Sequence, residues 1–496
     1  MLALIKEKFS WTLVRHFLEA IIAVEILSFL AYFYPPVGHW AAIIGWLAVL
    51  ILSWRNLTSG LLVLLVDLLI DSKGYLLFFP VGSFKLSWRI GVWGIIMAVW
   101  FLKSLGQAYR QKTVSLDYQR LKTAGLLPLA AMLFFGTVSA IIQHCQSSNI
   151  FFDANGWLFW LIILPVMSVA KWPLKRLMAA LMAGLLWLVA KTALLLYIFG
   201  HSSSAFLSIV YRWVRDTQVG EITKMSAQFY RVFIQSQVYL LIILAIAAWL
   251  LARQMPIKNW FKWLWQSGWS YLLILSLSLF PLIIGFSRSF WFGLAVIGLF
   301  LLVMVWRYYG WSIVWRWLIA SFIALILALI MIVVIVRFPW PKPQLSFDAG
   351  TLLEERLGDL GGEAGASSRW ALLPKMTEAI KKQPIFGHGF GATITYQSAD
   401  PRVLAINNGG NYTTYAFEWG WLDIAFKFGL LWAIWYFWWL NRIAIISWRQ
   451  GVLGQALTIG LLVLLAVHLF SPYLNHPLGI GYLSAMLTWL TVKKYD

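Results

Sequence analysis

The stretch IVWRWLIASFIALILALIMIVVIV, residues 313–336, carries one charged side chain, Arg316, among 24 residues. About 20 apolar residues in a helix span the hydrocarbon core of a bilayer, which is about 30 Å thick. Comparable apolar windows recur along the whole chain, at 12–33, 38–54, 57–71, 88–105, 123–143, 151–170, 177–199, 232–252, 268–286, 290–306, 420–440, 454–470 and 475–491. The sequence therefore predicts an all-α polytopic membrane protein with about 12–14 transmembrane helices.

The composition supports this class and excludes several others. Hydrophobic residues make up 61% of the 496 residues and charged residues only 12%, whereas soluble globular proteins carry about 25% charged residues. This balance excludes a soluble enzyme and a disordered chain. Cys145 is the only cysteine, so an intrachain disulfide and a cysteine-based metal cluster are excluded as well.

The net charge of +20 arises from 39 Lys and Arg against 19 Asp and Glu, and the basic residues are spread through short connectors. A nucleic-acid interface would gather them on one face, so no nucleic-acid partner is expected. In a membrane protein such residues orient the helices and attract anionic lipids. Binding of an anionic substrate is a second reason for the excess.

The distribution of Lys and Arg also predicts the orientation. Alternate connectors carry them, whereas the connectors at 35–39, 143–149 and 471–477 carry none. By the positive-inside rule, both termini are predicted to be cytoplasmic. Lys6 and Lys8 precede an apolar run that is too long for a signal peptide, so we interpret this run as a retained first span.

Two long connectors then fall on the outer side of the membrane. The prediction divides the chain into N-terminal transmembrane helices, an outer loop, central transmembrane helices, a large periplasmic or extracellular loop and C-terminal transmembrane helices, at 1–199, 200–230, 231–337, 338–419 and 420–496. The large loop holds eight of the nineteen acidic residues. Apolar residues at near-helical spacing between Trp370 and Phe386 indicate that it is partly helical.

Charged residues inside apolar spans are the strongest functional signal, because each costs roughly 2.5–3.5 kcal/mol at a helix centre. Lys191 lies near the middle of its span, and its sequence suggests no partner. Lys427 follows Asp423 by four residues, so these two can pair across one helical turn. For both lysines the alternative is a side chain that extends to the headgroups.

Arg231 and Arg288 differ from the lysines, because both are placed at the outer side beside hydroxyl and aromatic groups. A guanidinium binds phosphate oxygens in a bidentate fashion and does not lose its proton. Two of them at one level are suited to a diphosphate, which is the function we assign to this pair. Ser287 and Trp291 are secondary candidates for the same site.

The outer loop contains Gly387-x-Gly389-x-Gly391, which is only weakly similar to a phosphate-binding loop and lacks its Lys-Ser/Thr. A tight turn that brings the backbone close to another segment explains the glycines better. His388 and Tyr415 are secondary site candidates, although most histidines at such a place are neither base nor ligand. His468 is expected to be a packed, hydrogen-bonded group.

Glu418 stands where the large loop re-enters the membrane. One interpretation is a solvated helix-start residue that the helix dipole stabilises. The other is a partly desolvated general base that faces the arginines, and this role is our catalytic prediction.

Three segments resemble one family of membrane enzymes. FSRSFWFGLAVIGLF (286–300) resembles the SRxxW/L span of the O-antigen ligase and polymerase (Wzy/ligase-like) superfamily. Arg369 with PIFGHGFG (384–391), and FEWGWLDIAFKFGLL (417–431), are similar to its outer-loop and re-entry motifs. The match covers about 270–436, and the earlier spans agree only in number and character.

The resemblance implies a GT-C-like, metal-independent, inverting glycosyltransferase of the bacterial inner membrane, with its active site on the outer face. It would transfer a glycan from an undecaprenyl-diphosphate donor to a hydroxyl of an acceptor glycan or lipid, with no cofactor. Arg288, Arg231 and Arg369 would hold the diphosphate. Polysaccharide export or chain-length proteins are the further partners that it suggests.

The sequence departs from the family at one position: many ligases have His-Asn where this chain has Glu418-Trp419. Either Glu418 replaces that histidine as the base, or the site works without one. This departure favours a polysaccharide polymerase slightly over an O-antigen ligase. A transporter or flippase of a lipid-linked anion, and a non-catalytic scaffold, are the alternatives from other classes.

Overall fold

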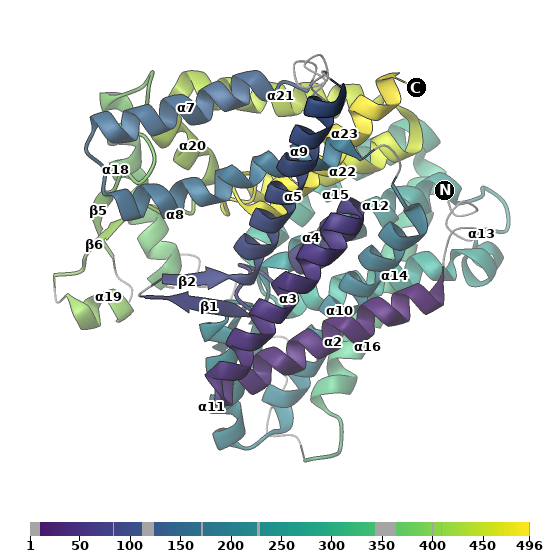
Figure 1. Ribbon diagram of the computed structural model, residues 1–496. Coiled ribbons are helices and arrows are strands. Elements are labelled where there is room, and N and C mark those ends of the chain that lie inside the picture. Colours follow the sequence, from purple (N-terminus) through teal and green to yellow (C-terminus); the bar gives the residue numbers. More distant parts are fainter. Residues whose placement is uncertain are drawn as a thin grey trace. The chain divides into compact units, whose positions relative to one another are not determined.

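The computed structural model describes residues 10–82, 84–111, 124–169, 172–225, 229–342, 364–398, 401–407 and 409–495 (Figure 1). Much of the acidic part of the predicted large loop, at 343–363, lies outside these residues. Within them the chain is an all-α polytopic membrane protein, as predicted. In the described ranges the strands form three short hairpins.

Nine helices of the described chain are long and apolar enough to cross a membrane: Pro35–Arg55, Trp88–Arg110, Ser147–Ser168, Leu174–His201, Gln235–Gln254, Trp260–Ile284, Arg288–Tyr309, Trp311–Val336 and Leu430–Trp448. Three windows that we predicted as spans form shorter apolar helices, Leu57–Ile70, Leu126–Ile142 and Gly451–Val467. The prediction of 12–14 spans therefore counts these shorter helices, together with helices at 11–33 and 477–495, as membrane-crossing.

The residues form two compact units, each built from two separate stretches of chain. Unit 1 comprises 1–115 and 164–348, and unit 2 comprises 116–163 and 349–496. The division into five consecutive segments that we predicted from the sequence follows chain order and differs in kind from these units. It stays a prediction.

Unit 1 contains most of the long apolar helices. Its elements are α2 (Trp11–Phe33), α3 (Pro35–Arg55), α4 (Leu57–Ile70), β1 (Phe78–Val81), β2 (Phe84–Ser87), α5 (Trp88–Gln111), α9 (Ile163–Ser168, which begins at the boundary), α10 (Leu174–His201), α11 (Ser204–Asp216), β3 (Glu221–Lys224), β4 (Tyr230–Phe233), the 3-10 turn η2 (Gln235–Gln237), α12 (Val238–Gln254), α13 (Trp260–Trp263), the π-helical turn η3 (Leu264–Gly268), α14 (Trp269–Ile284), α15 (Arg288–Tyr309) and α16 (Trp311–Val336). α14 packs against α12 and α16, and α10 packs against α2 and α4.

The two faces of α16 explain how the apolar stretch 313–336 is used. Ala320, Ala324 and Ala328 recur every four residues and are fully buried, so this face allows close helix packing. Phe322 and Ile330, on other faces of the helix, are 60% and 51% exposed. Large apolar side chains on the outside of a helix are suited to contact with lipid.

Unit 2 combines short helices with a hairpin. Its elements are α7 (Leu126–Ile142), α8 (Ser147–Leu158), the 3-10 turn η1 (Phe159–Ile162), α18 (Ala364–Lys382), β5 (Ile394–Gln397), α19 (Pro401–Ile406), β6 (Asn411–Thr414), α20 (Gly420–Phe428), α21 (Leu430–Trp448), α22 (Gly451–Val467) and α23 (Pro477–Tyr495). α18 confirms the helical spacing predicted in the outer loop, and it packs against α20 and β5. Gly429, with φ +86°, separates α20 from α21.

The hairpins were not predicted from the sequence. β1 pairs with β2, β3 with β4 and β5 with β6, all antiparallel, with four residues in each strand. Strands of this length give too little alternation for a period-two pattern to stand out beside long apolar helices.

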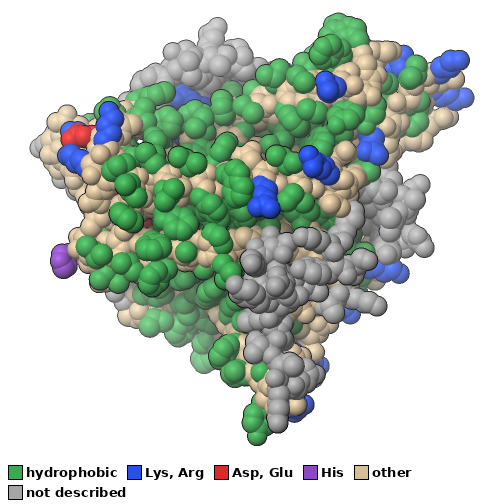
Figure 2. Space-filling model, turned by 90° about the horizontal axis from the view of Figure 1, so that it is seen from above, with side chains coloured by type: hydrophobic (Ala, Val, Ile, Leu, Met, Phe, Trp, Pro, Cys, Tyr) green, Lys and Arg blue, Asp and Glu red, His purple; other side chains and the backbone are tan. Residues whose placement is uncertain are grey.

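Figure 2 shows hydrophobic side chains over much of the described surface of this face, with Lys and Arg scattered among them. A water-facing surface of a soluble protein does not carry so large an apolar area.

A buried ion pair joins α2 to α10. Lys191, 2% exposed, lies 2.6 Å from Glu25 Oε1, and the indole N–H of Trp187 donates to the same oxygen at 2.9 Å. Lys191 also lies over the ring of Trp213, 5.4 Å from its centroid. The lysine for which the sequence suggested no partner is therefore enclosed by acidic and aromatic groups, and it does not extend to the headgroups.

Replacing Lys191 with Met is expected to lower the free energy of unfolding by about 3–5 kcal/mol, because Glu25 then stays buried without its cation. The double variant Glu25→Leu/Lys191→Met should recover most of the loss. Unfolding in mixed micelles, followed by circular dichroism, measures both. The exposed pair Arg15–Glu19 gives the control, since Arg15→Ala should change little. A single-variant loss no larger than that of Arg15→Ala would contradict the expectation.

Candidate functional site

The two arginines predicted to bind a diphosphate belong to unit 1, and a hydrogen bond from Arg231 reaches the turn that precedes Arg288. Arg231 lies on β4, opposite Thr223 of β3. Its Nε donates to the carbonyl oxygen of Gly285 at 2.8 Å, and its guanidinium lies 5.1 Å from the ring centroid of Phe233. Gly285 follows α14, and Arg288 begins α15 three residues later. Arg231 therefore contacts the turn that carries Arg288.

Hydroxyl and aromatic side chains shape this turn. The Ser287 and Ser289 hydroxyls lie 3.0 Å apart, and both serines are buried. Trp291 packs on Phe286 with ring centroids 5.6 Å apart, and its indole N–H donates to the carbonyl of Leu282 at 3.4 Å. These contacts hold the first turn of α15 against the end of α14.

The turn is suited to binding an anion. Both arginines are half-buried. Arg288 is the first residue of a 22-residue helix, where the helix dipole presents its positive end. Guanidinium groups, serine hydroxyls and a helix N-terminus together supply the donors that a phosphate group accepts from.

Arg369 and Glu418 belong to unit 2 and form an ion pair with each other. Their side chains are 34% and 54% exposed, so the pair is at the surface of the unit. Glu418 directly precedes Trp419, the residue before α20. The predicted base and the third predicted diphosphate ligand are thus partners.

The glycine-rich segment forms a tight turn, as predicted. Gly387, Gly389 and Gly391 have φ values of +66°, +80° and +72°. A Cβ on Gly389 would overlap the backbone of Ala140, and one on Gly387 would lie 2.5 Å from the backbone nitrogen of Gly429. The three glycines are required by conformation and by close backbone packing.

His388 is held inside this turn. Its Nε2 lies 2.9 Å from the carbonyl of Ala379, and its Nδ1 lies 3.3 Å from Gln143 Oε1. The ring stacks on Phe426 at 4.6 Å. Both ring nitrogens are engaged within the unit, which favours a packing role over that of a base or a ligand.

Tyr415 is half-buried between β6 and α20. Burial and the nearby Asp153 carboxylate raise the pKa of its hydroxyl above the usual value. Tyr415 therefore stays protonated at neutral pH and can donate a hydrogen bond.

The pair predicted between Lys427 and Asp423 is present, and the sequence missed its third member. Lys427 Nζ lies 2.6 Å from Asp423 Oδ1 and 2.6 Å from Asp153 Oδ1 of α8. Asn475 donates to the second oxygen of Asp423, and the backbone N–H of Gly391 donates to the second oxygen of Asp153. One lysine thus joins α8, α20 and the glycine turn.

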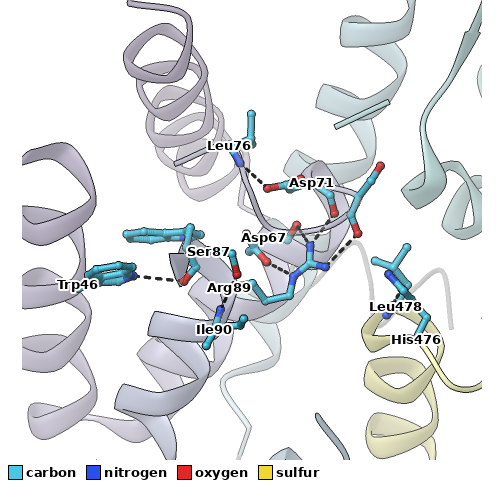
Figure 3. A network of polar contacts seen from close by, with 11 residues as sticks. Trp46, Asp67, Asp71, Leu76, Ser87, Arg89, Ile90, His476 and Leu478 are labelled. Atoms are coloured by element: carbon cyan, nitrogen blue, oxygen red, sulfur yellow. Dashed lines mark hydrogen bonds and ion pairs between the residues drawn. The ribbon is translucent and has the colours of Figure 1, made fainter. Parts of the chain in front are cut away.

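A second buried network, in unit 1, was not identified from the sequence (Figure 3). Arg89 Nε donates to Asp67 at 2.6 Å, and its other nitrogens donate to the carbonyls of Ser72 and Asp71 at 3.0 and 2.7 Å. The Asp71 carboxylate accepts from the backbone N–H of Leu76 at 2.9 Å. Arg89 therefore satisfies the carbonyls at the C-terminal end of α4. A charged residue inside the apolar window 57–71, Asp67, could have indicated this network from the sequence.

His468 is fully buried, and its Nδ1 accepts from the backbone N–H of Leu474 at 3.2 Å. This agrees with the predicted packed, hydrogen-bonded role. Cys145 is half-buried, and burial together with Asp153 raises the pKa of its thiol, which disfavours a thiolate nucleophile. Within the described ranges, no group of three or more His, Cys, Asp and Glu is placed to hold a metal ion.

Comparisons of the chain with protein-family models, curated proteins and solved structures give no match.

Replacing Gly389 with Ala is expected to destabilise the protein by about 3 kcal/mol, because a side chain is strained at this φ and overlaps Ala140. Thermal unfolding in detergent, followed by far-UV circular dichroism, measures the change. Gly298 in α15 is the matched control, since a Cβ there meets nothing within 4 Å. Gly298→Ala should leave the midpoint unchanged or raise it; equal effects of the two variants would refute the packing argument.

Proposed function

We propose that this protein is a membrane glycosyltransferase that takes a glycan from a lipid-linked diphosphate donor and transfers it to a hydroxyl of an acceptor. The observation that carries the proposal is the hydrogen bond from Arg231 to Gly285, in the turn that leads to Arg288. This hydrogen bond brings the strand that carries Arg231 next to the turn that leads to Arg288, at the start of α15.

This arrangement favours a diphosphate over a carboxylate or a single phosphate. A diphosphate has oxygens on two phosphorus atoms, and each guanidinium can bind one phosphate in bidentate geometry. The α15 dipole adds a third favourable interaction. Arginine keeps its charge at any physiological pH, so the site needs no proton to bind its anion.

The same groups are suited to the chemistry. When the anomeric C–O bond to the diphosphate breaks, negative charge accumulates on the departing oxygens, and fixed cationic donors stabilise it. The acceptor oxygen forms the new bond from the opposite face, with inversion. Glu418 is proposed as the base that removes the hydroxyl proton, and Arg369 fixes its carboxylate.

The resemblance supplies the finer part of the proposal: a GT-C-like enzyme of the bacterial inner membrane that uses an undecaprenyl-diphosphate donor, with termini in the cytoplasm and the reaction on the outer face. Polymerisation of polysaccharide repeat units is the proposed reaction, and transfer to a lipid acceptor is the nearest alternative.

Arg288→Ala is expected to reduce glycan transfer at least 100-fold in proteoliposomes that contain a radiolabelled undecaprenyl-diphosphate oligosaccharide, because a fixed donor to the leaving group is lost. Arg288→Lys should recover part of the rate. Arg307→Ala, which removes an exposed arginine from the other end of α15, is the control and should be fully active.

The labelled products separate the candidate reactions. Longer glycan ladders indicate a polymerase, and label on another lipid indicates a ligase. Glu418→Gln should slow transfer without weakening donor binding. Full activity of Arg288→Ala would remove the proposed donor site, and movement of the donor across the bilayer without a new glycosidic bond would establish a transporter instead.

A further inference from the structure

Four side chains of unit 2 form a mixed aromatic and charged group, which we call the Trp370 cluster. Arg369 and Trp370 are consecutive residues of α18, and Glu418 and Trp419 are consecutive residues before α20. The two charged members pair with each other, and so do the two indoles. The diphosphate site of unit 1 uses none of the aromatic members.

The buried indole fixes the exposed one. Trp419 is 8% exposed, its N–H donates to the carbonyl of Arg369 at 3.0 Å, and its ring packs on Phe470 at 5.3 Å. Trp370 is 56% exposed and meets Trp419 edge to face, with ring centroids 5.5 Å apart. A large exposed indole is thereby held in one place by a rigid neighbour.

The helix that carries Trp370 is itself well anchored. The Ser368 and Ser398 hydroxyls lie 2.6 Å apart. This contact joins α18, two residues before Trp370, to the residue that follows β5. Leu372, Met376 and Ile380 bury one face of α18 in a core shared with α20 and β5. The exposed members of the cluster therefore need little ordering when a ligand binds, which lowers the entropic cost of binding.

A sugar ring matches this combination of groups. One face of a pyranose presents C–H groups that pack on an indole, and its rim presents hydroxyls that both donate and accept hydrogen bonds. Arg369, the residue before the exposed indole, supplies donors, and its ion-pair partner Glu418 supplies acceptors. An acyl chain would use the indole and leave the ion pair without a function.

We propose that the Trp370 cluster binds sugar rings of the acceptor glycan, with Trp370 as the stacking platform and the Arg369–Glu418 pair as the hydrogen-bonding rim. This inference rests on the proposed glycosyl transfer and deepens it, because it names the substrate that unit 2 recognises. It also gives Arg369 and Glu418 a binding role beside those proposed above.

Binding of the full-length protein in nanodiscs to an array of bacterial oligosaccharides of defined structure tests the proposal. The wild type should bind at least one saccharide, Trp370→Ala should weaken that binding at least tenfold, and Trp370→Phe should retain part of it. Trp438→Ala is the matched control: this indole is 52% exposed on α21 of the same unit, lies beside Arg442, and should be dispensable.

Three results would overturn the proposal. The first is that the wild type binds no saccharide on the array, and the second is that Trp370→Ala and Trp438→Ala bind equally well. A lower midpoint of thermal unfolding for Trp370→Ala in nanodiscs, with saccharide binding unchanged, would identify Trp370 as a membrane-interface anchor and would also overturn it.

A transfer assay separates this inference from the proposed function. Trp370→Ala should raise the KM for acceptor and leave the binding of labelled donor unchanged, whereas Arg288→Ala should impair donor use and leave saccharide binding on the array intact. If Arg288→Ala is fully active and Trp370→Ala still loses saccharide binding, the donor site is wrong and the glycan site stands. If Arg288→Ala loses activity and Trp370→Ala keeps its saccharide binding, the glycan site is wrong and the donor site stands.

Discussion

A charge buried among apolar helices must have a partner, and this constraint determines which helices lie together. Leaving a charge unpaired in a medium of low dielectric constant costs several kcal/mol, so a cation and a carboxylate on different helices must meet. Arg89 of α5 meets Asp67 of α4, Lys191 of α10 meets Glu25 of α2, and Lys427 of α20 meets Asp153 of α8. Apolar packing alone tolerates sliding between helices, whereas these pairs fix a single register.

The arginines of the proposed donor site have a different environment from these interior cations. Arg231 and Arg288 are half-buried on a hairpin and at a helix start, whereas Arg89, Lys191 and Lys427 are nearly inaccessible and bound to carboxylates. An interior cation committed to a carboxylate serves the fold. A half-buried cation at the end of a helix can exchange partners with a ligand, which is why the functional proposal rests on the arginines.

The sequence predicted the helices well and the partners of the charges poorly, and the reason is separation along the chain. Apolar length and spacing are local properties, so the long windows and the helix α18, within the segment predicted to be an outer loop, could be found. The Lys427–Asp423 pair could be found as well, because it spans one helical turn. Glu25 lies 166 residues from Lys191, and no local pattern joins them. The contact of Arg231 with Gly285 and the pairing of Arg369 with Glu418 likewise depend on how distant segments fold back.

The Asp153–Lys427 pair also has a consequence for the order in which the protein is made. The two residues are 274 positions apart, and the span that carries Asp153 is synthesised first. At about 5–20 residues per second, the ribosome needs roughly 15–55 s to reach the lysine. During that interval α8 holds an acidic group in or near the bilayer with its final cation still unmade. The ion pair that joins α8 to α20 therefore forms only after Lys427 has been synthesised, so this part of unit 2 is completed late.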